Sequence, residues 1–189
     1  LMRIVGGRHR GRPLRTLVGK GLRPTSDRAR EAVFNILGHG IDWPGLKDAT
    51  LIDVFAGTGA YGLEALSRGA AHATFIDIDA KALELVRDNA GALGEGDRIT
   101  PLKLDAARLA PPPIAAGTPC RLAFCDPPYN SGLSGPAILG LADKGWIGGG
   151  AILIVEVAAK ENFDPPPGFN VLDQRTYGAA RVIFLKYPG

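Results

Sequence analysis

Cysteine is scarce in this sequence, and the two cysteines that occur, Cys120 and Cys125, are poorly placed for pairing. Both fall in an apolar stretch that we predict to be a strand, where successive side chains alternate between the two faces. Their odd separation points them to opposite faces, so we expect neither a disulfide nor a shared metal ion. The three histidines are scattered without the spacing of ligands, and we therefore predict no metal site.

Long hydrophobic runs are also lacking. No apolar stretch approaches the roughly 20 residues that cross a bilayer, and no apolar segment of a signal peptide follows the first arginines. We therefore expect a cytoplasmic protein without a membrane partner. With 189 residues, of which 46% are hydrophobic and 22% charged, the chain is long enough for one sizeable core. We expect it to be a monomer.

Acidic residues are almost absent from the start of the chain. Residues 1–30 contain nine Lys or Arg and one acid, a net charge of +8, whereas residues 31–189 carry a net charge of −5. A basic arm on an acidic body is typical of a protein that binds a polyanion. Charge alone also allows a solvated, partly disordered tail, but Ile4 to Gly7 and Pro13-Leu14 place turn and strand residues among the arginines. This mixture favours a folded hairpin.

A helix is predicted after Pro24, with Thr25 or Ser26 as its N-cap. Its apolar residues are spaced as on one helical face, and Gly38 and Gly40 are expected to end it; these residues are Ala29, Ala32, Val33, Ile36 and Leu37. The chain is therefore expected to consist of a basic extension, 1–40, and a catalytic domain, 41–189.

From Thr50 onward, strand and helix patterns alternate. We predict strands at 50–55, 73–77, 98–104, 121–125, 151–157, 170–177 and 180–187, and helices at 60–68, 80–93 and 136–144. Such alternation is typical of an α/β fold whose parallel sheet carries helices on both faces. In that architecture ligands bind beyond the carboxyl ends of the strands, where the strand order reverses.

The first of these strands leads into a glycine loop, Gly57-Thr58-Gly59. With Gly62 it satisfies the G-x-G-x-x-G pattern of dinucleotide-binding proteins, and Asp77 lies at a suitable distance to bind a ribose. The loop alone therefore does not separate NAD from S-adenosylmethionine. Asp53 favours S-adenosylmethionine, because a carboxylate just before the turn can meet the cationic amino group that this donor has and NAD lacks.

Further acids follow the next strands. Asp77 is placed to accept hydrogen bonds from both ribose hydroxyls, and Asp79 is expected to cap the following helix. Asp105, which precedes Ala106, suits the adenine amino group. Each acid alone could be an ordinary strand-end cap, but four successive strand ends carry one, and Asp126 is the fourth.

Asp126 begins the most specific motif, Asp126-Pro127-Pro128-Tyr129. Its two prolines lack the backbone N–H donor, so the backbone here offers only carbonyl oxygens, which accept hydrogen bonds. A carbonyl and the Asp126 carboxylate could thus hold a planar amine, while Tyr129 offers a ring on which an extruded base can stack. Methyl transfer from a sulfonium to such an amine needs orientation more than a strong base.

Over essentially its whole length the chain resembles the RsmD family, bacterial 16S ribosomal RNA guanine-N2 methyltransferases. The N-terminal stretches are the narrower part of the match, since the strand-end motifs occur in many methyltransferases. The matching stretches are residues 2–7 with Gly11-Arg12, 23–28 through Phe34-Asn35, 53–59, 126–129 and Tyr177-Gly178.

The resemblance implies a class I, Rossmann-like methyltransferase fold, whose mostly parallel seven-stranded sheet includes one antiparallel strand. It implies S-adenosylmethionine as the donor, with S-adenosylhomocysteine as the product, and the N2 amine of one guanine in 16S rRNA as the acceptor. The rRNA would be part of the small subunit or of a late assembly intermediate. The segment around Thr25 to Arg30 would close over the methionine end of the donor.

Residue by residue, these expectations give three groups. The donor site comprises Thr25, Asp53, Phe55, Ala56, Gly57, Thr58, Gly59, Asp77, Ile78, Asp105, Ala106 and Asp126. The catalytic motif comprises Asp126, Pro127, Pro128 and Tyr129. The RNA-binding arm comprises Arg3, Arg8, Arg10, Arg12, Arg15 and Arg23.

Other functions stay open at this point. An adenine-N6 DNA methyltransferase could use the same motif, but such enzymes usually need a target-recognition region that this sequence does not offer. An RNA-binding protein with an inactive methyltransferase core would be expected to lack the strand-end acids, which are intact. A nicotinamide dehydrogenase would leave the Asp126 motif unexplained. The Ala/Pro-rich loop 110–119 departs from the family pattern near the predicted adenine site.

Overall fold

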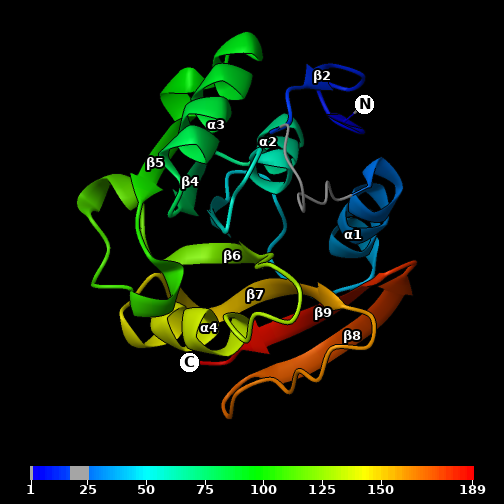
Figure 1. The fold of residues 1–189 in the computed structure, drawn as a ribbon, viewed down its shortest axis with the longest axis vertical. Coiled ribbons are helices and arrows are strands. Elements are labelled where there is room, and N and C mark those ends of the chain that lie inside the picture. The colour runs from blue at the N-terminus through cyan, green and yellow to red at the C-terminus, as the bar shows by residue number, and fades with distance from the viewer. Residues whose placement is uncertain (1, 18–25) are drawn as a thin grey trace.

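A computed structural model describes residues 2–17 and 26–189 of the chain. It contains a short antiparallel hairpin and a seven-stranded sheet with helices on both faces (Figure 1). The hairpin pairs β1 (Met2–Arg3) with β2 (Pro13–Leu14). The folded hairpin that we predicted is thus confirmed.

The seven-stranded sheet has the order β5-β4-β3-β6-β7-β9-β8. All pairs from β5 to β7 are parallel, and β9 runs antiparallel to both of its neighbours. One reversed strand in a mostly parallel sheet is what we predicted. The strands are β3 (Thr50–Val54), β4 (His72–Asp77), β5 (Ile99–Lys103), β6 (Cys120–Cys125), β7 (Ile147–Ala158), β8 (Asn170–Tyr177) and β9 (Ala180–Tyr187).

Two hydrophobic clusters pack against opposite faces of this sheet. One contains side chains of the hairpin and of three helices, α1 (Asp27–His39), α2 (Ala60–Ser67) and α3 (Ala80–Ala92). The other contains side chains of α4 (Ser134–Asp143) and of the 3-10 turn η2 (Ala106–Arg108). Two further 3-10 turns are η1 (Gly96–Arg98) and η3 (Ile114–Ala116). The strand order changes direction between β3 and β6, so a ligand site is expected there.

The hairpin packs against the carboxyl end of α2. The Arg8 amide donates to the Ser67 carbonyl at 2.9 Å, and the Ser67 hydroxyl donates to the Gly6 carbonyl at 2.7 Å. Gly7 has a φ of 77°, and a Cβ there would lie 2.0 Å from the Ser67 carbonyl oxygen. Only glycine therefore allows this close approach.

Helix α1 begins as predicted, because the Ser26 hydroxyl accepts a hydrogen bond from the Ala29 amide at 3.0 Å. The alternative cap, Thr25, lies outside the described residues. Gly40 is the C-cap, whereas Gly38 lies inside the helix, so one of the two predicted end signals is wrong. A glycine weakens a helix without ending it when the neighbouring turns are held by packing.

The cysteine prediction is only partly right. Both thiols are buried and free, but Cys120 and Cys125 pack in the same hydrophobic cluster and not on opposite faces. The pairing of β6 with β7 shifts between Cys120 and Leu122, and such an irregularity breaks the strict alternation of side chains. The strand β7 also begins four residues earlier than predicted, because Ile147 pairs with Cys120 despite the glycines that follow it.

Among the helices of the described chain, none has the length and apolar character that a membrane span requires. Within residues 2–17 and 26–189, no group of three or more Cys, His, Asp and Glu side chains is arranged to hold a metal ion.

Candidate active site

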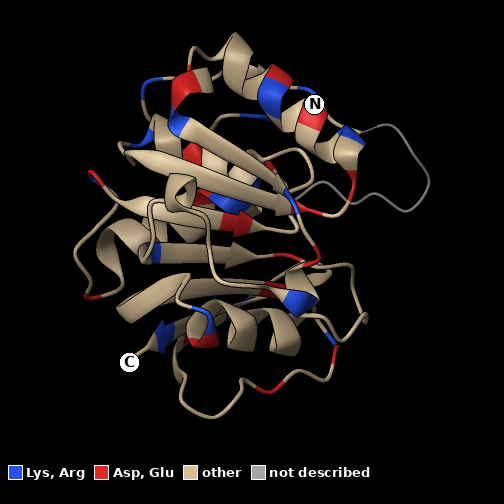
Figure 2. Ribbon diagram, turned by 90° about the vertical axis from the view of Figure 1, so that its left-hand side faces the viewer, with Lys and Arg blue, Asp and Glu red and all other residues tan. Residues whose placement is uncertain are grey.

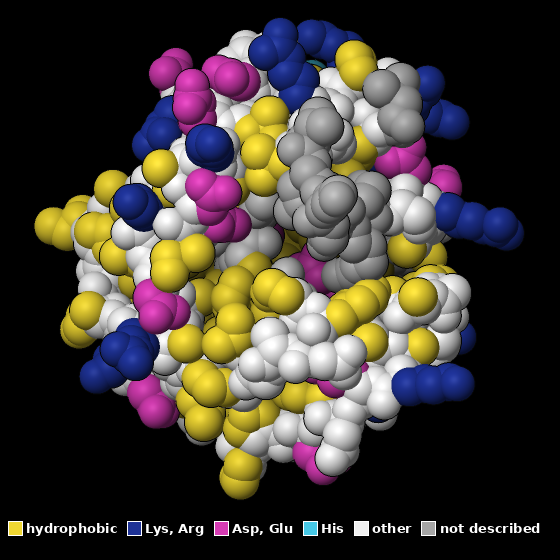
Figure 3. Space-filling view, viewed as in Figure 1, with side chains coloured by type: hydrophobic (Ala, Val, Ile, Leu, Met, Phe, Trp, Pro, Cys, Tyr) yellow, Lys and Arg dark blue, Asp and Glu magenta, His cyan; other side chains and the backbone are white. Residues whose placement is uncertain are grey.

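A cavity of about 680 Å³ opens at the carboxyl ends of the central strands. Acidic residues gather at these strand ends (Figure 2), and hydrophobic side chains border the hollow near the centre of the face seen in Figure 3. All but two of the predicted donor-site residues line this cavity. One exception, Gly59, is not among the lining residues, and the other, Thr25, lies outside the described residues.

The loop between β3 and α2 has an unusual backbone. Phe55, Gly57 and Gly59 all have positive φ, at 60°, 55° and 79°. Gly59 is the N-cap of α2, and a Cβ there would lie 3.1 to 3.2 Å from the side chains of Val86 and Phe75. Phe55 is not a glycine, so its conformation is strained, as is common beside ligand sites. The loop with these dihedral angles lines the cavity with Phe55, Ala56, Gly57 and Thr58.

Asp53 lies at the bottom of the cavity, almost fully buried. Its Oδ2 accepts a hydrogen bond from the Gly62 amide at 3.0 Å. The pKa of Asp53 is raised to about 8: burial raises it most, the hydrogen bond from the Gly62 amide lowers it, and the charge of Asp77 raises it by a smaller amount. A carboxyl group in this position gains most from a cation that enters the cavity, because the cation favours the ionised form.

Asp77 holds the glycine loop in place. Its Oδ2 accepts from the Gly57 amide at 3.0 Å, and its Oδ1 accepts from the Asp79 amide at 2.9 Å. Asp79 is the N-cap of α3, as predicted, and accepts from the Lys81 amide at 2.9 Å. The carboxylate of Asp77 therefore links β4 to the loop and faces the cavity with the lone pairs that remain.

Asp105 and Ala106 line the same cavity, as does Ile78, whose side chain is 68% exposed. The Oδ1 atom of Asp105 accepts from the Ala107 amide at 2.9 Å, which starts η2. The carboxylate thus has the capping role that we considered for each strand-end acid, and it also reaches the cavity. A cavity lined by an exposed apolar side chain and by acids can take a flat, partly polar ring.

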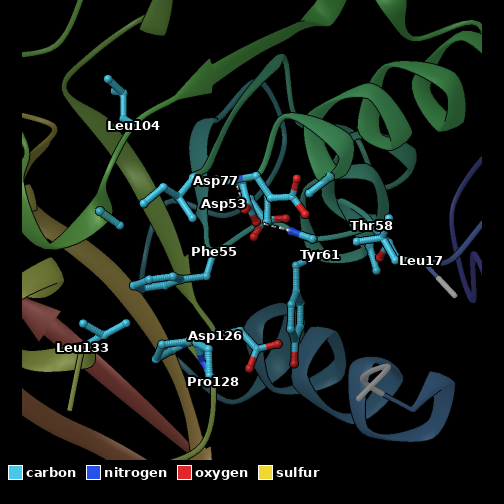
Figure 4. A pocket seen from close by; sticks show the side chains of 18 of the residues that line it. Leu17, Asp53, Phe55, Thr58, Tyr61, Asp77, Leu104, Asp126, Pro128 and Leu133 are labelled. Atoms are coloured by element: carbon cyan, nitrogen blue, oxygen red, sulfur yellow. Dashed lines mark hydrogen bonds between the residues drawn. The ribbon is translucent and has the colours of Figure 1, made fainter. Parts of the chain in front are cut away.

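The motif Asp126 to Tyr129 follows β6 and lines the same cavity. The Asp126 amide donates to the Val54 carbonyl at 3.4 Å, which ties the start of the motif to β3. Asn130 has a φ of 57°, and its amide donates to Glu161 Oε1 at 2.7 Å, so the turn after the motif is held as well. In Figure 4 the Asp126 carboxylate faces the space that Asp53 and Asp77 border from the opposite side.

Two residues near this motif are absent from the predicted site. Tyr61, in the first turn of α2, lines the cavity, and its hydroxyl lies 3.4 Å from Glu156 Oε1. Glu156 lies on β7 and is only 2% exposed. An acid inside the apolar run of a buried strand was the sequence signal that could have revealed Glu156. Tyr61 had no such signal, because an aromatic residue in a first helical turn is common in protein cores. Met2, Thr16, Leu17 and Leu133 also line the cavity without having been predicted.

The arginines of the N-terminal arm differ in their surroundings. Arg8 forms an ion pair of 2.5 Å with Glu95, which is nearly buried. Burial alone would raise the pKa of Glu95, but hydrogen bonds from His9 and Arg8 outweigh it and lower the pKa. Arg12 donates to the Ala92 carbonyl at 2.7 Å and is otherwise exposed.

Three more arginines of the arm, Arg3, Arg10 and Arg15, are exposed, whereas Arg23 lies outside the described residues. Arg30, which we counted in the basic arm, is fully buried and paired with Glu64. The charge available for a polyanion is therefore smaller than the sequence suggests.

Strand order and site together decide the class of this protein. The central strands alone would also suit a dinucleotide-binding domain, but the reversed β9 between β7 and β8 is the antiparallel strand that the resemblance to class I methyltransferases implied. The protein is a methyltransferase of this class, and the dehydrogenase interpretation is dropped.

Comparison with known proteins narrows the class to a family. The family model described as "Conserved hypothetical protein 95" matches residues 2–186, and the chain belongs to this family. The chain is 39% identical over 186 residues to the ribosomal RNA small subunit methyltransferase D of Escherichia coli, covering 98% of this chain and 89% of that protein. The resemblance to the RsmD family is thus confirmed.

Two further similarities agree. A putative rRNA methyltransferase of Bacillus subtilis is 37% identical over 129 residues, which cover 68% of this chain and 67% of that protein. The solved structure of a putative methyltransferase from Escherichia coli superimposes with a TM-score of 0.80 at 33% identity, covering 100% of this chain and 98% of that one.

Proposed function

We propose that this chain transfers a methyl group from S-adenosylmethionine to the exocyclic N2 amine of one guanine in the 16S rRNA of the small ribosomal subunit. One observation carries the proposal: the glycine loop after β3 and the motif Asp126 to Tyr129 line a single cavity. The donor and a planar acceptor can therefore meet inside it. The name of the Escherichia coli relative, a ribosomal RNA small subunit methyltransferase, supports this choice of substrate.

The residues of the cavity fit the donor. Its volume of about 680 Å³ lies within the usual range of roughly 300–1,000 Å³ for such ligands. Asp53 would hold the cationic amino group, Asp77 the ribose hydroxyls, and Asp105 the adenine amine beside Ile78. Gly57 has no side chain, so the donor can lie directly against the loop backbone at this position.

The chemistry needs little from the protein beyond orientation. When bound, S-adenosylmethionine supplies a methyl group on a sulfonium sulfur, which keeps the electron pair as the new nitrogen–carbon bond forms and the nitrogen releases a proton. The Asp126 carboxylate accepts a hydrogen bond from the amine and turns the nitrogen toward the donor. Tyr129 stacks on the extruded base and holds its plane, which is typically worth about 1–3 kcal/mol. Holding the reactants in line contributes most of the acceleration.

The substrate would be the small subunit or a late assembly intermediate, to which the exposed arginines of the hairpin add nonspecific attraction for phosphates. Such a substrate lies in the cytoplasm. We expect the protein to act as a monomer, because the elements that form the cavity all belong to one chain.

An adenine-N6 DNA methyltransferase is the second candidate, because the Asp126 motif can hold any planar amine. One experiment separates the candidates. The protein is incubated with labelled S-adenosylmethionine and, in parallel, with unmethylated small subunits, naked 16S rRNA or DNA, and the methylated nucleoside is identified by mass spectrometry. N2-methylguanosine in the small-subunit sample is the expected result, and N6-methyladenine in DNA would overturn the proposal.

The role of Asp126 can be tested in the same assay. Asp126→Ala is expected to abolish methyl transfer while calorimetry still detects donor binding, because Asp53 and Asp77 are unchanged. Full turnover of this variant would refute the role of Asp126.

A further inference from the structure

Two hydroxyl groups of the site share one buried carboxylate. Tyr61 Oη lies 3.4 Å from Glu156 Oε1, and Tyr129 Oη lies 3.4 Å from Glu156 Oε2. The three residues come from α2, from the turn after β6 and from β7. Cys125 pairs with Val155 in the parallel register of β6 and β7, so Asp126, just after β6, and Glu156, on β7, each follow one member of this pair.

The direction of these hydrogen bonds follows from the chemistry of the groups. A carboxylate has only lone pairs, so each tyrosine must donate its single hydroxyl proton to Glu156. Burial raises the pKa of Tyr61, and the charges of Glu156 and Asp126 raise it further, so the phenol keeps this proton. A hydroxyl whose only proton points to Glu156 offers nothing but lone pairs to any other neighbour.

The part of the cavity where the methylated base would lie is therefore lined by hydrogen-bond acceptors. In Figure 4 the hydroxyl of Tyr61 and the carboxylate of Asp126 lie next to each other at the same end of the cavity. Pro127 and Pro128 add carbonyl oxygens without N–H donors. A base edge that fits such a wall has two neighbouring N–H donors.

Guanine has this edge, because its N1–H stands beside the N2 amine. Adenine does not, because the ring nitrogen next to its N6 amine is an acceptor and would face the lone pairs of the wall. We infer that Glu156 is a positioning residue that selects guanine: it holds the Tyr61 hydroxyl as an acceptor toward the edge of the base and fixes the Tyr129 ring that stacks on the base. This inference rests on the proposed function and adds to it the reason why the motif takes guanine.

Replacing Glu156 by glutamine, which has the same shape, should weaken the preference for guanine. In Glu156→Gln the side-chain amide can accept from one tyrosine, but its NH₂ group donates to the other. When the NH₂ group faces Tyr61, the Tyr61 hydroxyl can turn its proton toward the cavity and meet an acceptor on the base. The variant should therefore accept a base whose ring nitrogen beside the amine carries a lone pair.

The test uses 2-aminopurine, which keeps the 2-amino group of guanine but has an acceptor at N1. Small subunits are reconstituted with 16S rRNA that carries either guanine or 2-aminopurine at the methylated position, which mass spectrometry identifies first. The kcat/KM ratio for the two substrates is measured for the wild type and for Glu156→Gln. The wild type is expected to prefer guanine by roughly a hundredfold or more, since a site built for a substrate N–H rejects an analogue that lacks it. The variant is expected to lose at least about tenfold of this preference.

Two controls separate selection from a loss of structure. Donor affinity by calorimetry should be the same for both proteins, because Glu156 is not among the residues that line the cavity. Tyr61→Phe, which removes one acceptor but leaves the carboxylate, is expected to narrow the preference as well and serves if Glu156→Gln does not fold. An unchanged preference in the folded variants overturns the inference and leaves the proposed function standing. A wild type that makes no N2-methylguanosine refutes the proposed function, and the inference with it.

Discussion

Replacing Glu64 by alanine would remove the acceptor that joins the hairpin and α1 to α2. Glu64 is fully buried, and its oxygens accept from the amides of Val5 and Gly6 at 3.0 and 2.9 Å. They also accept from the Nε atoms of Arg30 and Arg68 at 3.1 and 2.8 Å. The alanine variant would leave two half-buried amides, the fully buried guanidinium of Arg30 and the partly exposed guanidinium of Arg68 without this partner.

The loss of unfolding free energy in Glu64→Ala depends on which groups lose their hydrogen-bond partner. Removing one member of a buried ion pair costs about 3–5 kcal/mol. Arg30 keeps a second carboxylate, since Asp27 Oδ1 lies 3.1 Å from its Nη2 atom, and it also donates to the Arg3 carbonyl. We therefore expect Glu64→Ala to cost about 3 kcal/mol, the lower end of that range.

The matched variant Arg30→Met should cost less. It leaves Glu64 with Arg68 and two amides, and it releases only the partly exposed Asp27 and the carbonyl of Arg3. We expect about 1.5 kcal/mol, the lower end for a hydrogen bond to a charged group.

Thermal unfolding followed by circular dichroism measures both losses. In a domain of this size each kcal/mol lowers the Tm by about 2–4 °C. The Tm should therefore fall by about 6–12 °C for Glu64→Ala and by about 3–6 °C for Arg30→Met. If Arg30→Met destabilises the protein as much as Glu64→Ala, the network is not centred on Glu64 and the reasoning is refuted.

Three further predictions concern the hairpin and the donor site. Gly7→Ala should lower the free energy of unfolding in urea more than Gly11→Ala does. Both glycines have positive φ, but only Gly7 touches the end of α2. Equal losses of unfolding free energy would exclude the steric cause. Donor affinity of the wild type should rise by up to about tenfold per pH unit from pH 5.5 to 7.5, because a bound cation favours ionised Asp53, whose pKa is about 8 in the free protein. Asp53→Asn should lack this rise in calorimetry, and a rise that persists would assign the proton to another group. Arg10→Ala with Arg12→Ala should weaken binding to the small subunit and lower its salt dependence, whereas an unchanged salt slope would show that neither arginine contacts phosphate.

Much of the fold could be predicted because its signals are local. Periodicity placed every strand of the large sheet within a few residues, and the last two strands have the predicted bounds. The largest error, at the start of β7, arose because Gly148 to Gly150 lack the side chains on which a strand pattern depends. The faces of Cys120 and Cys125 were wrong for a related reason, since a shift in register leaves no trace in the spacing of residues.

The site was predictable to the extent that parallel strands bring their carboxyl ends together. For this reason Asp53, Asp77, Asp105 and Asp126 line one cavity although they are spread over more than seventy residues of sequence. Glu156 escaped prediction because its contacts with tyrosines depend on the neighbouring strand and on α2.

The sequence by itself determined the order of the elements, the loop that could hold a methyl donor and the family, because these depend on short patterns along the chain. Only the tertiary structure decided which charges act where. It buries Arg30 against Glu64 and pairs Arg8 with Glu95, partners that are 34 and 87 residues apart in the chain. It also buries Asp53 deeply enough to raise its pKa to about 8. Burial and nearby groups from distant parts of the chain determine the free energy of the ionised form of a side chain. Neither can be read from a residue's neighbours in sequence.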